Sequence, residues 1–156
     1  MKILVTADTH GYYNQISDYI LLHDDIDLLI HAGDGVDDVV DIHNETGIDY
    51  YVVDGNNDFF TNHEFDEIIE IDKFKIFLTH GHNYYVDFSY DDLVKKAKEN
   101  NCNIIIHGHT HKYVNQYIDD ILILNPGSIF LSRDRNPGFV IMTINDDKLE
   151  IERISV

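Results

Sequence analysis

The sequence predicts an α/β protein, because short β-branched runs alternate with stretches of helical period in the first half of the chain. Parallel strands joined by crossover helices are the economical arrangement for such an alternation. In the second half, closely spaced apolar runs predict antiparallel strands instead. With 156 residues, 44% of them hydrophobic, the chain has the size and composition of one globular domain, so we expect a single domain over residues 1–156.

The first half contains two predicted βα units and a third strand. Strands are predicted over residues 2–7, 27–31 and 50–53, and helices over residues 14–23 and 36–45. Apolar side chains recur on one face of each predicted helix, as Ile16 and Ile20 do in the first and Val36 and Val40 in the second. Each helix therefore has an apolar face that can pack on a sheet.

The second half begins with a predicted hairpin and continues mainly as strands. The hairpin covers residues 67–71 and 75–79, and a helix beginning at the capping pattern of Ser89 and Asp92 runs to about residue 100. Five further strands are predicted, over residues 103–106, 113–118, 121–124, 139–144 and 149–154. Asp pairs at 119–120 and 146–147 indicate turns between neighbouring strands.

The chain is strongly acidic, with 29 Asp and Glu against 11 Lys and Arg and a formal net charge of −18. General binding to nucleic acid depends on basic side chains that neutralise phosphates, so we expect none. Any phosphate that the protein handles should need bound cations, although an acidic surface alone is usual for solubility. The single cysteine, Cys102, indicates a reducing compartment and predicts a cytoplasmic protein. The N-terminal apolar run ends at Asp8, too early for a signal peptide or membrane span, so no membrane association is expected.

Potential metal ligands follow nearly every predicted strand that leads into a loop. Two residues apart on an extended chain, such side chains point to the same side and can reach one ion or two adjacent ions. The clusters are Asp8 and His10; Asp34 and Asp37; Asn56 and Asp58; His80 and His82; and His107, His109 and His111. Each alone also fits a turn, a helix cap or a surface histidine. Together they predict a site for Mn, Fe, Ni, Co or Zn, provided that the strands form one sheet.

The order of these motifs resembles the calcineurin-like metallophosphoesterase superfamily. The resemblance covers D-x-H, GD-x-x-D, GN-x-D, T-H-G-H and G-H-T-H, and extends to "NPGS" at residues 125–128. It is closest to the small branch that includes YfcE-type and archaeal phosphodiesterases and the Vps29-like proteins. The resemblance implies a four-layer α/β/β/α sandwich of two mixed sheets with a dinuclear metal site at the strand ends.

The resemblance also implies a ligand set and a mechanism. Two divalent ions about 3.5–4 Å apart would hold a hydroxide between them and direct it at a small phosphodiester. One ion would be held by Asp8, His10 and His111, the other by Asn56, His80 and His109, with Asp34 bridging both. Asp37 and Asp58 would orient the loops, whereas His82 and His107 lie outside the family's ligand pattern and could simply bond to the backbone. The candidate catalytic residues are Asp34, Asn56, His80, Asn57 and Asp58.

One departure concerns the residue after the GN pair, which in the family is often His or Cys and here is Asn57. Asparagine cannot act as a general acid at neutral pH, so we expect a preference for good leaving groups such as aryl phosphodiesters. The alternatives are a Vps29-like protein-interaction scaffold without catalysis and a phosphomonoesterase. Competent donors at all seven ligand positions favour an enzyme.

Small family members often form oligomers, so a homo-oligomer stays open. The aromatic segment 83–90 could be a pocket rim, a subunit contact or, as we favour, a loop folded on the core.

Overall fold

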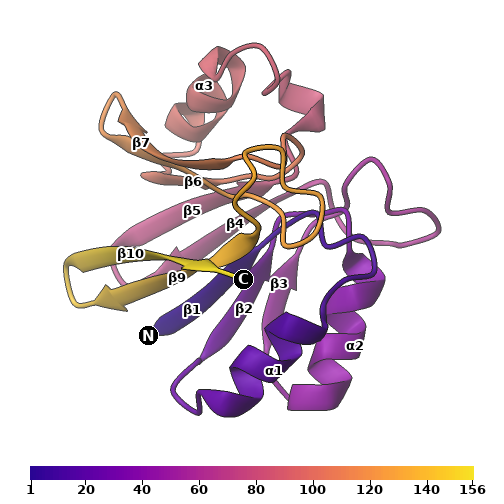
Figure 1. The fold of residues 1–156 in the computed structure, drawn as a ribbon. Coiled ribbons are helices and arrows are strands. Elements are labelled where there is room, and N and C mark those ends of the chain that lie inside the picture. The colour runs from indigo at the N-terminus through magenta and orange to yellow at the C-terminus, as the bar shows by residue number, and fades with distance from the viewer.

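A computed structural model describes residues 1–156 as two five-stranded sheets packed face to face, with helices on both outer faces (Figure 1). The first sheet has the order β10–β9–β1–β2–β3 and the second the order β4–β5–β6–β8–β7. Helices α1 and α2 cover the outer face of the first sheet, and α3 covers that of the second. The expected four-layer sandwich of two mixed sheets is confirmed.

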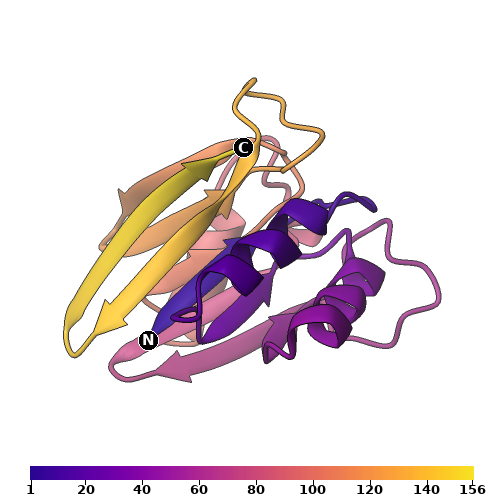
Figure 2. The same cartoon turned by 60° about the horizontal axis from the view of Figure 1, so that its bottom comes forward.

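The first sheet contains strands from both the N-terminal and the C-terminal part of the chain. Its strands are β1 (Lys2–Thr6), β2 (Leu28–His31), β3 (Tyr50–Val52), β9 (Gly138–Asn145) and β10 (Lys148–Ser155). The strands β1, β2 and β3 run parallel, connected by α1 (Asn14–Leu22) and α2 (Val36–Thr46), while β9 pairs antiparallel with β1 and β10. The predicted βα units are therefore confirmed, with boundaries that shift by one or two residues. Figure 2 shows α1 and α2 lying together over this sheet.

The second sheet carries the predicted hairpin and the later strands. It contains β4 (Asp66–Ile71), β5 (Phe74–Thr79), β6 (Ile104–Ile106), β7 (Tyr113–Ile118) and β8 (Ile121–Pro126), with the 3₁₀ helix η1 (His82–Tyr84) and α3 (Asp91–Glu99) between β5 and β6. The strands β5, β6 and β8 are parallel, whereas β4 and β7 pair antiparallel at the edges. None of the helices combines the length and apolar character needed to cross a membrane.

Apolar side chains fill three layers between these elements. Ile3 and Val5 of β1 face the second sheet and meet Ile76 and Ile104, whereas Leu4 faces α1 and α2. Because β1 has packed layers on both faces, all of its residues from Ile3 to Thr6 are buried. Burial on both faces explains why the central strands are continuous apolar runs in the sequence.

Two expectations were wrong in detail. The ligand-bearing strands do not form one sheet: β1 to β3 belong to the first sheet, and β5 and β6 to the second. The clusters still converge, because strands of both sheets end at the same edge of the sandwich. Helix α3 is not capped by Ser89, since its N-cap is Tyr90 and the Ser89 hydroxyl accepts a bond from the Asp91 N–H at 3.0 Å, one residue earlier than predicted.

Candidate metal centre

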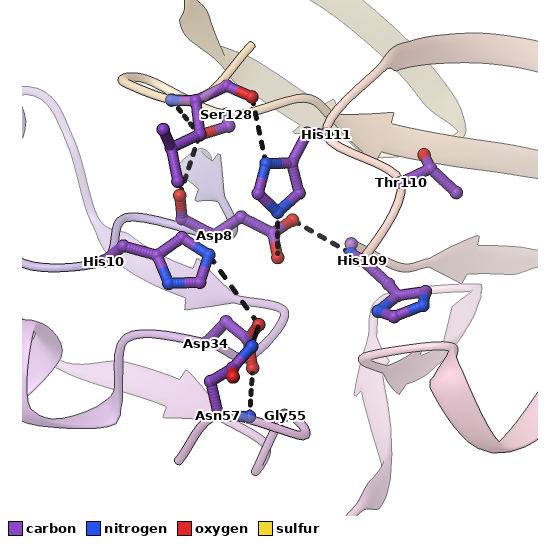
Figure 3. Close-up of polar contacts among 12 residues, drawn as sticks. Asp8, His10, Asp34, Gly55, Asn57, His109, Thr110, His111 and Ser128 are labelled. Atoms are coloured by element: carbon purple, nitrogen blue, oxygen red, sulfur yellow. Dashed lines mark hydrogen bonds and ion pairs between the residues drawn. The ribbon is translucent and has the colours of Figure 1, made fainter. Parts of the chain in front are cut away.

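Carboxylate and imidazole groups from both sheets meet where the strands end (Figure 3). The Asp8 Oδ1 atom lies 3.3 Å from His111 Nε2 and 3.8 Å from His80 Nε2. Asp34 Oδ2 lies 3.5 Å from His80 Nε2 and 3.7 Å from His10 Nε2. Two groups have donor atoms close enough together to hold a metal ion: Asp8, His10 and His111, and Asp8, Asp34 and His80.

The two remaining predicted ligands join this cluster through one amide oxygen. Asn56 Oδ1 lies 3.0 Å from His80 Nε2 and 3.1 Å from His109 Nδ1. The backbone N–H of His109 donates to Asp8 Oδ2 at 2.9 Å, which ties the loop after β6 to the loop after β1. All seven predicted ligands therefore lie around one centre, although they come from five loops.

Three histidines are oriented by a bond at the ring nitrogen that faces away from the centre. His80 Nδ1 donates to the Ala32 carbonyl at 2.7 Å, and His111 Nδ1 donates to the Leu131 carbonyl at 3.0 Å. His109 Nε2 contacts Asp87 Oδ2 at 2.9 Å. Metal-binding histidines usually have such a partner, which fixes the ring and leaves the other nitrogen for the ion. Asp87 lies in the aromatic segment 83–90, and nothing in its sequence surroundings indicated this role.

Two buried polar atoms among the seven predicted ligands have no hydrogen-bond partner. They are Asp8 Oδ1 and His10 Nε2. A buried polar atom without a partner is unfavourable unless something else neutralises it. Both atoms belong to one group that could hold an ion, and the oxygen and nitrogen donors suit a divalent ion. The residues present therefore fit a metal site.

The backbone adopts an uncommon conformation at several residues of the centre. Five of the seven predicted ligands have positive φ angles of 47–69° although none is glycine: Asp8, His10, Asp34, His109 and His111. Such conformations are uncommon outside glycine and are retained mainly where function or the surrounding structure requires them. Here they turn each side chain back toward the centre just after its strand ends.

The carboxylates and imidazoles of the cluster shift one another's pKa values. Burial opposes the charge of Asp34, but hydrogen bonds from His80 and Asn57 outweigh it and hold the Asp34 pKa well below its usual range. Burial likewise opposes protonation of His80, yet Asp34 and the charge of Asp8 raise its pKa. The nearby Asp8 carboxylate raises the pKa of His111. A divalent ion would compete with protons for these imidazole nitrogens.

Asp58 anchors the two loops that carry Asp34 and Asn56. Its Oδ2 atom accepts bonds from the N–H groups of Asp34 and Gly55, both at 2.7 Å. Its Oδ1 atom accepts from Gly35 at 2.9 Å and from Val36 at 3.0 Å. With four backbone donors on one carboxylate, Asp58 has the loop-orienting geometry that the family resemblance implied.

The second loop anchor is Asp38, not the predicted Asp37, which is exposed. Asp38 Oδ2 accepts from the Gly11 N–H at 2.8 Å and from the Thr9 hydroxyl at 2.5 Å. Thr9 also contacts His31 Nε2 at 3.1 Å. Asp38 faces inward because it lies on the buried side of α2, one residue on from Asp37.

His31 lies beneath this anchor. Its Nδ1 atom accepts from the Gly33 N–H at 3.1 Å, so the Nε2 atom carries the proton and donates to Thr9. Burial lowers the His31 pKa to about 4, which keeps the ring neutral. His31 was absent from the predicted site because it reads as the last residue of a strand.

Asn57 contacts Asp34 twice. Its backbone N–H donates to Asp34 Oδ1 at 2.9 Å and its Nδ2 to Asp34 Oδ2 at 2.7 Å. His107 is fully buried, with Nδ1 donating to the Gly108 carbonyl at 2.9 Å and Nε2 3.2 Å from the Tyr90 hydroxyl. Burial lowers the His107 pKa to about 4. His107 therefore bonds to the backbone, which is the alternative to metal binding stated for it above.

The aromatic segment 83–90 is divided between core and surface. Tyr84 packs edge-on against Phe77, and its hydroxyl donates to Asp66 at 2.5 Å. Tyr85 and Phe88 are exposed. The segment is therefore only partly folded on the core. Asp87, which contacts His109, lies in its outer part.

Comparisons with known proteins identify the family of the chain. The family model described as calcineurin-like phosphoesterase superfamily domain matches residues 1–147. A probable metallophosphoesterase from Bacillus subtilis is 29% identical over 149 residues, which cover 94% of this chain and 86% of that protein. A phosphodiesterase from Methanocaldococcus jannaschii is 31% identical over 144 residues, covering 81% of this chain and 83% of the other. The crystal structure of Vps29 complexed with zinc from Entamoeba histolytica superposes with a TM-score of 0.80 at 26% identity, covering 99% of both chains.

Proposed function

Because this chain belongs to the calcineurin-like phosphoesterase superfamily, we propose that it is a dinuclear, divalent-metal-dependent phosphodiesterase acting on small phosphodiesters. The observation that carries the proposal is the centre itself, where seven donors converge around the unpartnered Asp8 Oδ1 and His10 Nε2 atoms. The resemblance to an archaeal protein named as a phosphodiesterase supports a diester substrate.

We assign Asp8, His10 and His111 to one ion and Asn56, His80 and His109 to the other, with Asp34 contacting both. The ions would be Mn, Ni, Co, Fe or Zn. When bound, two such ions lower the pKa of water and offset negative charge on phosphoryl oxygens. The residues that hold them are oriented from behind, by the Ala32 and Leu131 carbonyls and by Asp87.

The pocket beside the centre explains why cations would be needed. It has a volume of about 260 Å³ and is lined by four aspartates but no lysine or arginine: Asp34, Asp37, Asp38 and Asp58. An anionic phosphodiester would be repelled from such a surface. Bound divalent ions would reverse the local charge, so the chain's acidic composition and its proposed substrate are compatible only through the metal.

Asn57 would act on Asp34 rather than on the leaving group. Both of its N–H groups point to the Asp34 carboxylate, which holds that carboxylate in one orientation. Its amide has no proton to transfer at neutral pH. The leaving group would therefore depart without protonation from this position, which favours phenolate-like leaving groups.

The test is hydrolysis of bis-p-nitrophenyl phosphate after chelator treatment and reconstitution with Mn²⁺, Ni²⁺ or Co²⁺. We expect activity only with added metal, loss of activity in His111→Ala, and unchanged activity in His23→Ala, whose exposed ring bonds to the Tyr19 carbonyl at the end of α1. Faster hydrolysis of p-nitrophenyl phosphate than of the diester would favour the phosphomonoesterase alternative. Metal content of two ions per chain is expected after reconstitution.

Metal binding alone does not separate the enzyme from the Vps29-like scaffold, since a Vps29 structure contains zinc. Hydrolysis does separate them. A metal-loaded protein that hydrolyses neither ester but binds a protein partner stoichiometrically would contradict our proposal. The cytoplasmic location and any homo-oligomer remain predictions from the sequence.

A further inference from the structure

A second pocket, which we call the base pocket, adjoins the metal centre. It has a volume of about 490 Å³ and is lined mainly by apolar and aromatic side chains: Tyr12, Ile129, Phe130, Pro137 and Val156. Small-molecule sites typically have volumes of about 300–1,000 Å³ and linings of this kind. Gly11 lines both this pocket and the acidic pocket that contains His10 and Asp34, so the two pockets are neighbours.

Ser128, which precedes the Ile129 and Phe130 wall of the base pocket, is bonded to Asp8 of the metal centre (Figure 3). The Ser128 hydroxyl donates to the Asp8 carbonyl at 2.8 Å and accepts from the Phe130 N–H at 3.3 Å. On the same loop, the Leu131 carbonyl accepts from His111 Nδ1 at 3.0 Å. The position of Phe130 is therefore fixed relative to two of the proposed metal ligands.

Tyr12 and Phe130 form a stacked aromatic pair at this wall. Their ring centroids are 3.4 Å apart and their planes are inclined by 10°. The two side chains come from different loops and stay 53% and 48% exposed. An exposed, pre-stacked aromatic pair next to a reactive centre is a platform on which a planar ring can bind, and stacking on such side chains is the common means of binding single bases.

The polar groups of the pocket narrow the choice of ring. Its only polar side chains besides the Tyr12 hydroxyl are the amides of Asn14 and Gln15, and it has no charged side chain. Side-chain amides can donate and accept at once, and they pair with the hydrogen-bonding edge of a base. A free phosphate or a sugar phosphate would find no cation here. Long nucleic acid is disfavoured by the net charge of −18.

We propose that the base pocket binds the nucleobase of a small nucleotide phosphodiester whose phosphate lies at the metal centre. The inference rests on the proposed function and specifies its substrate class. The base would stack at Tyr12 and Phe130, with the amides of Asn14 and Gln15 at its edge. Selectivity for the nucleoside would come from this pocket, while the metal centre would act on the phosphodiester group itself.

The test compares two esters with the same leaving group in the Mn²⁺-loaded protein. Adenosine 5′-p-nitrophenyl phosphate and methyl p-nitrophenyl phosphate both release p-nitrophenolate, so their ratio of kcat/KM reports binding of the nucleoside. We expect a ratio of about five or more, the lower end of what stacking of one base contributes. The ratio should fall to about one in Phe130→Ala and stay unchanged in Tyr117→Ala, which removes an exposed aromatic ring on β7.

A second measurement separates this inference from the proposed function. Hydrolysis of both esters at equal kcat/KM in the unsubstituted protein would overturn the base pocket and leave the phosphodiesterase proposal standing. Hydrolysis of neither ester would contradict the phosphodiesterase proposal. In that case, saturation-transfer NMR of adenosine with the chelator-treated protein would show whether the base pocket binds a nucleobase. Adenosine binding that is lost in Phe130→Ala supports the pocket, and no binding overturns it.

Discussion

Replacement of Asp58 by asparagine tests how the loops of the metal centre are held. The Asp58 carboxylate accepts bonds from four backbone N–H groups, two at each oxygen. Asparagine has nearly the same shape but only one acceptor oxygen. Its NH₂ group would face two of the four N–H donors, so two bonds to a charged acceptor are lost and two donors are left opposite another donor.

The expected loss follows from these two bonds. Hydrogen bonds to charged groups contribute about 1.5–3 kcal/mol each, and Asp58 is only partly buried, so the lower value applies. Asp58→Asn should therefore reduce the free energy of unfolding by about 3 kcal/mol. Because the same bonds position Asp34, metal affinity should also fall, by about tenfold, as is typical when a group that orients a ligand is altered.

Urea denaturation of the chelator-treated protein measures the first effect, and calorimetric titration with Mn²⁺ measures the second. The matched control is Asp37→Asn, which removes a charge from the same pocket at an exposed position. This control should stay within about 0.5 kcal/mol of the unsubstituted protein. If Asp58→Asn were as stable as Asp37→Asn and bound Mn²⁺ equally well, the four bonds would not hold the loops and the reasoning would be refuted.

Three further predictions concern single side chains. Asp87→Asn should weaken Mn²⁺ binding by about tenfold in a calorimetric titration, because His109 loses its orienting carboxylate; unchanged affinity would exclude that role. His31 should stay neutral to about pH 4 in an NMR titration, and a pKa near 6.5 would contradict its burial. Because an unfolded His31 binds a proton below pH 6.5 and the folded one does not, His31 should remove about 3 kcal/mol of stability as the pH falls from 6.5 to 4. Asn57→His should raise hydrolysis of alkyl diesters more than of aryl diesters, and an unchanged ratio would rule out its effect on the leaving group.

Most of the fold could be predicted because the patterns are local. The strands and helices follow from apolar residues that recur with a period of about two or 3.6, and the structure confirms them to within one or two residues. The α3 cap was misplaced because Tyr90, not Ser89, is the N-cap, and side-chain bonding at that scale depends on how the preceding loop folds.

The chemistry of the candidate site was also local. Asp, Asn and His at strand ends can be recognised as possible metal ligands from their residue type, and the structure brings all seven predicted ligands together. The residues that orient these ligands could not be predicted in the same way. Asp87 contacts His109 across 22 positions and Ser128 contacts Asp8 across 120, and no sequence period relates such distant residues.

The sequence by itself determined which elements form and which potential metal ligands lie at their ends. The tertiary structure alone decided that strands of two separate sheets end at one edge, that Asp38 instead of Asp37 faces inward, and that Tyr12 and Phe130 stack beside the centre. The physical reason is that hydrophobic periodicity acts between near neighbours in the chain, whereas the choice of partner across the sandwich depends on how the packed layers bring distant loops together.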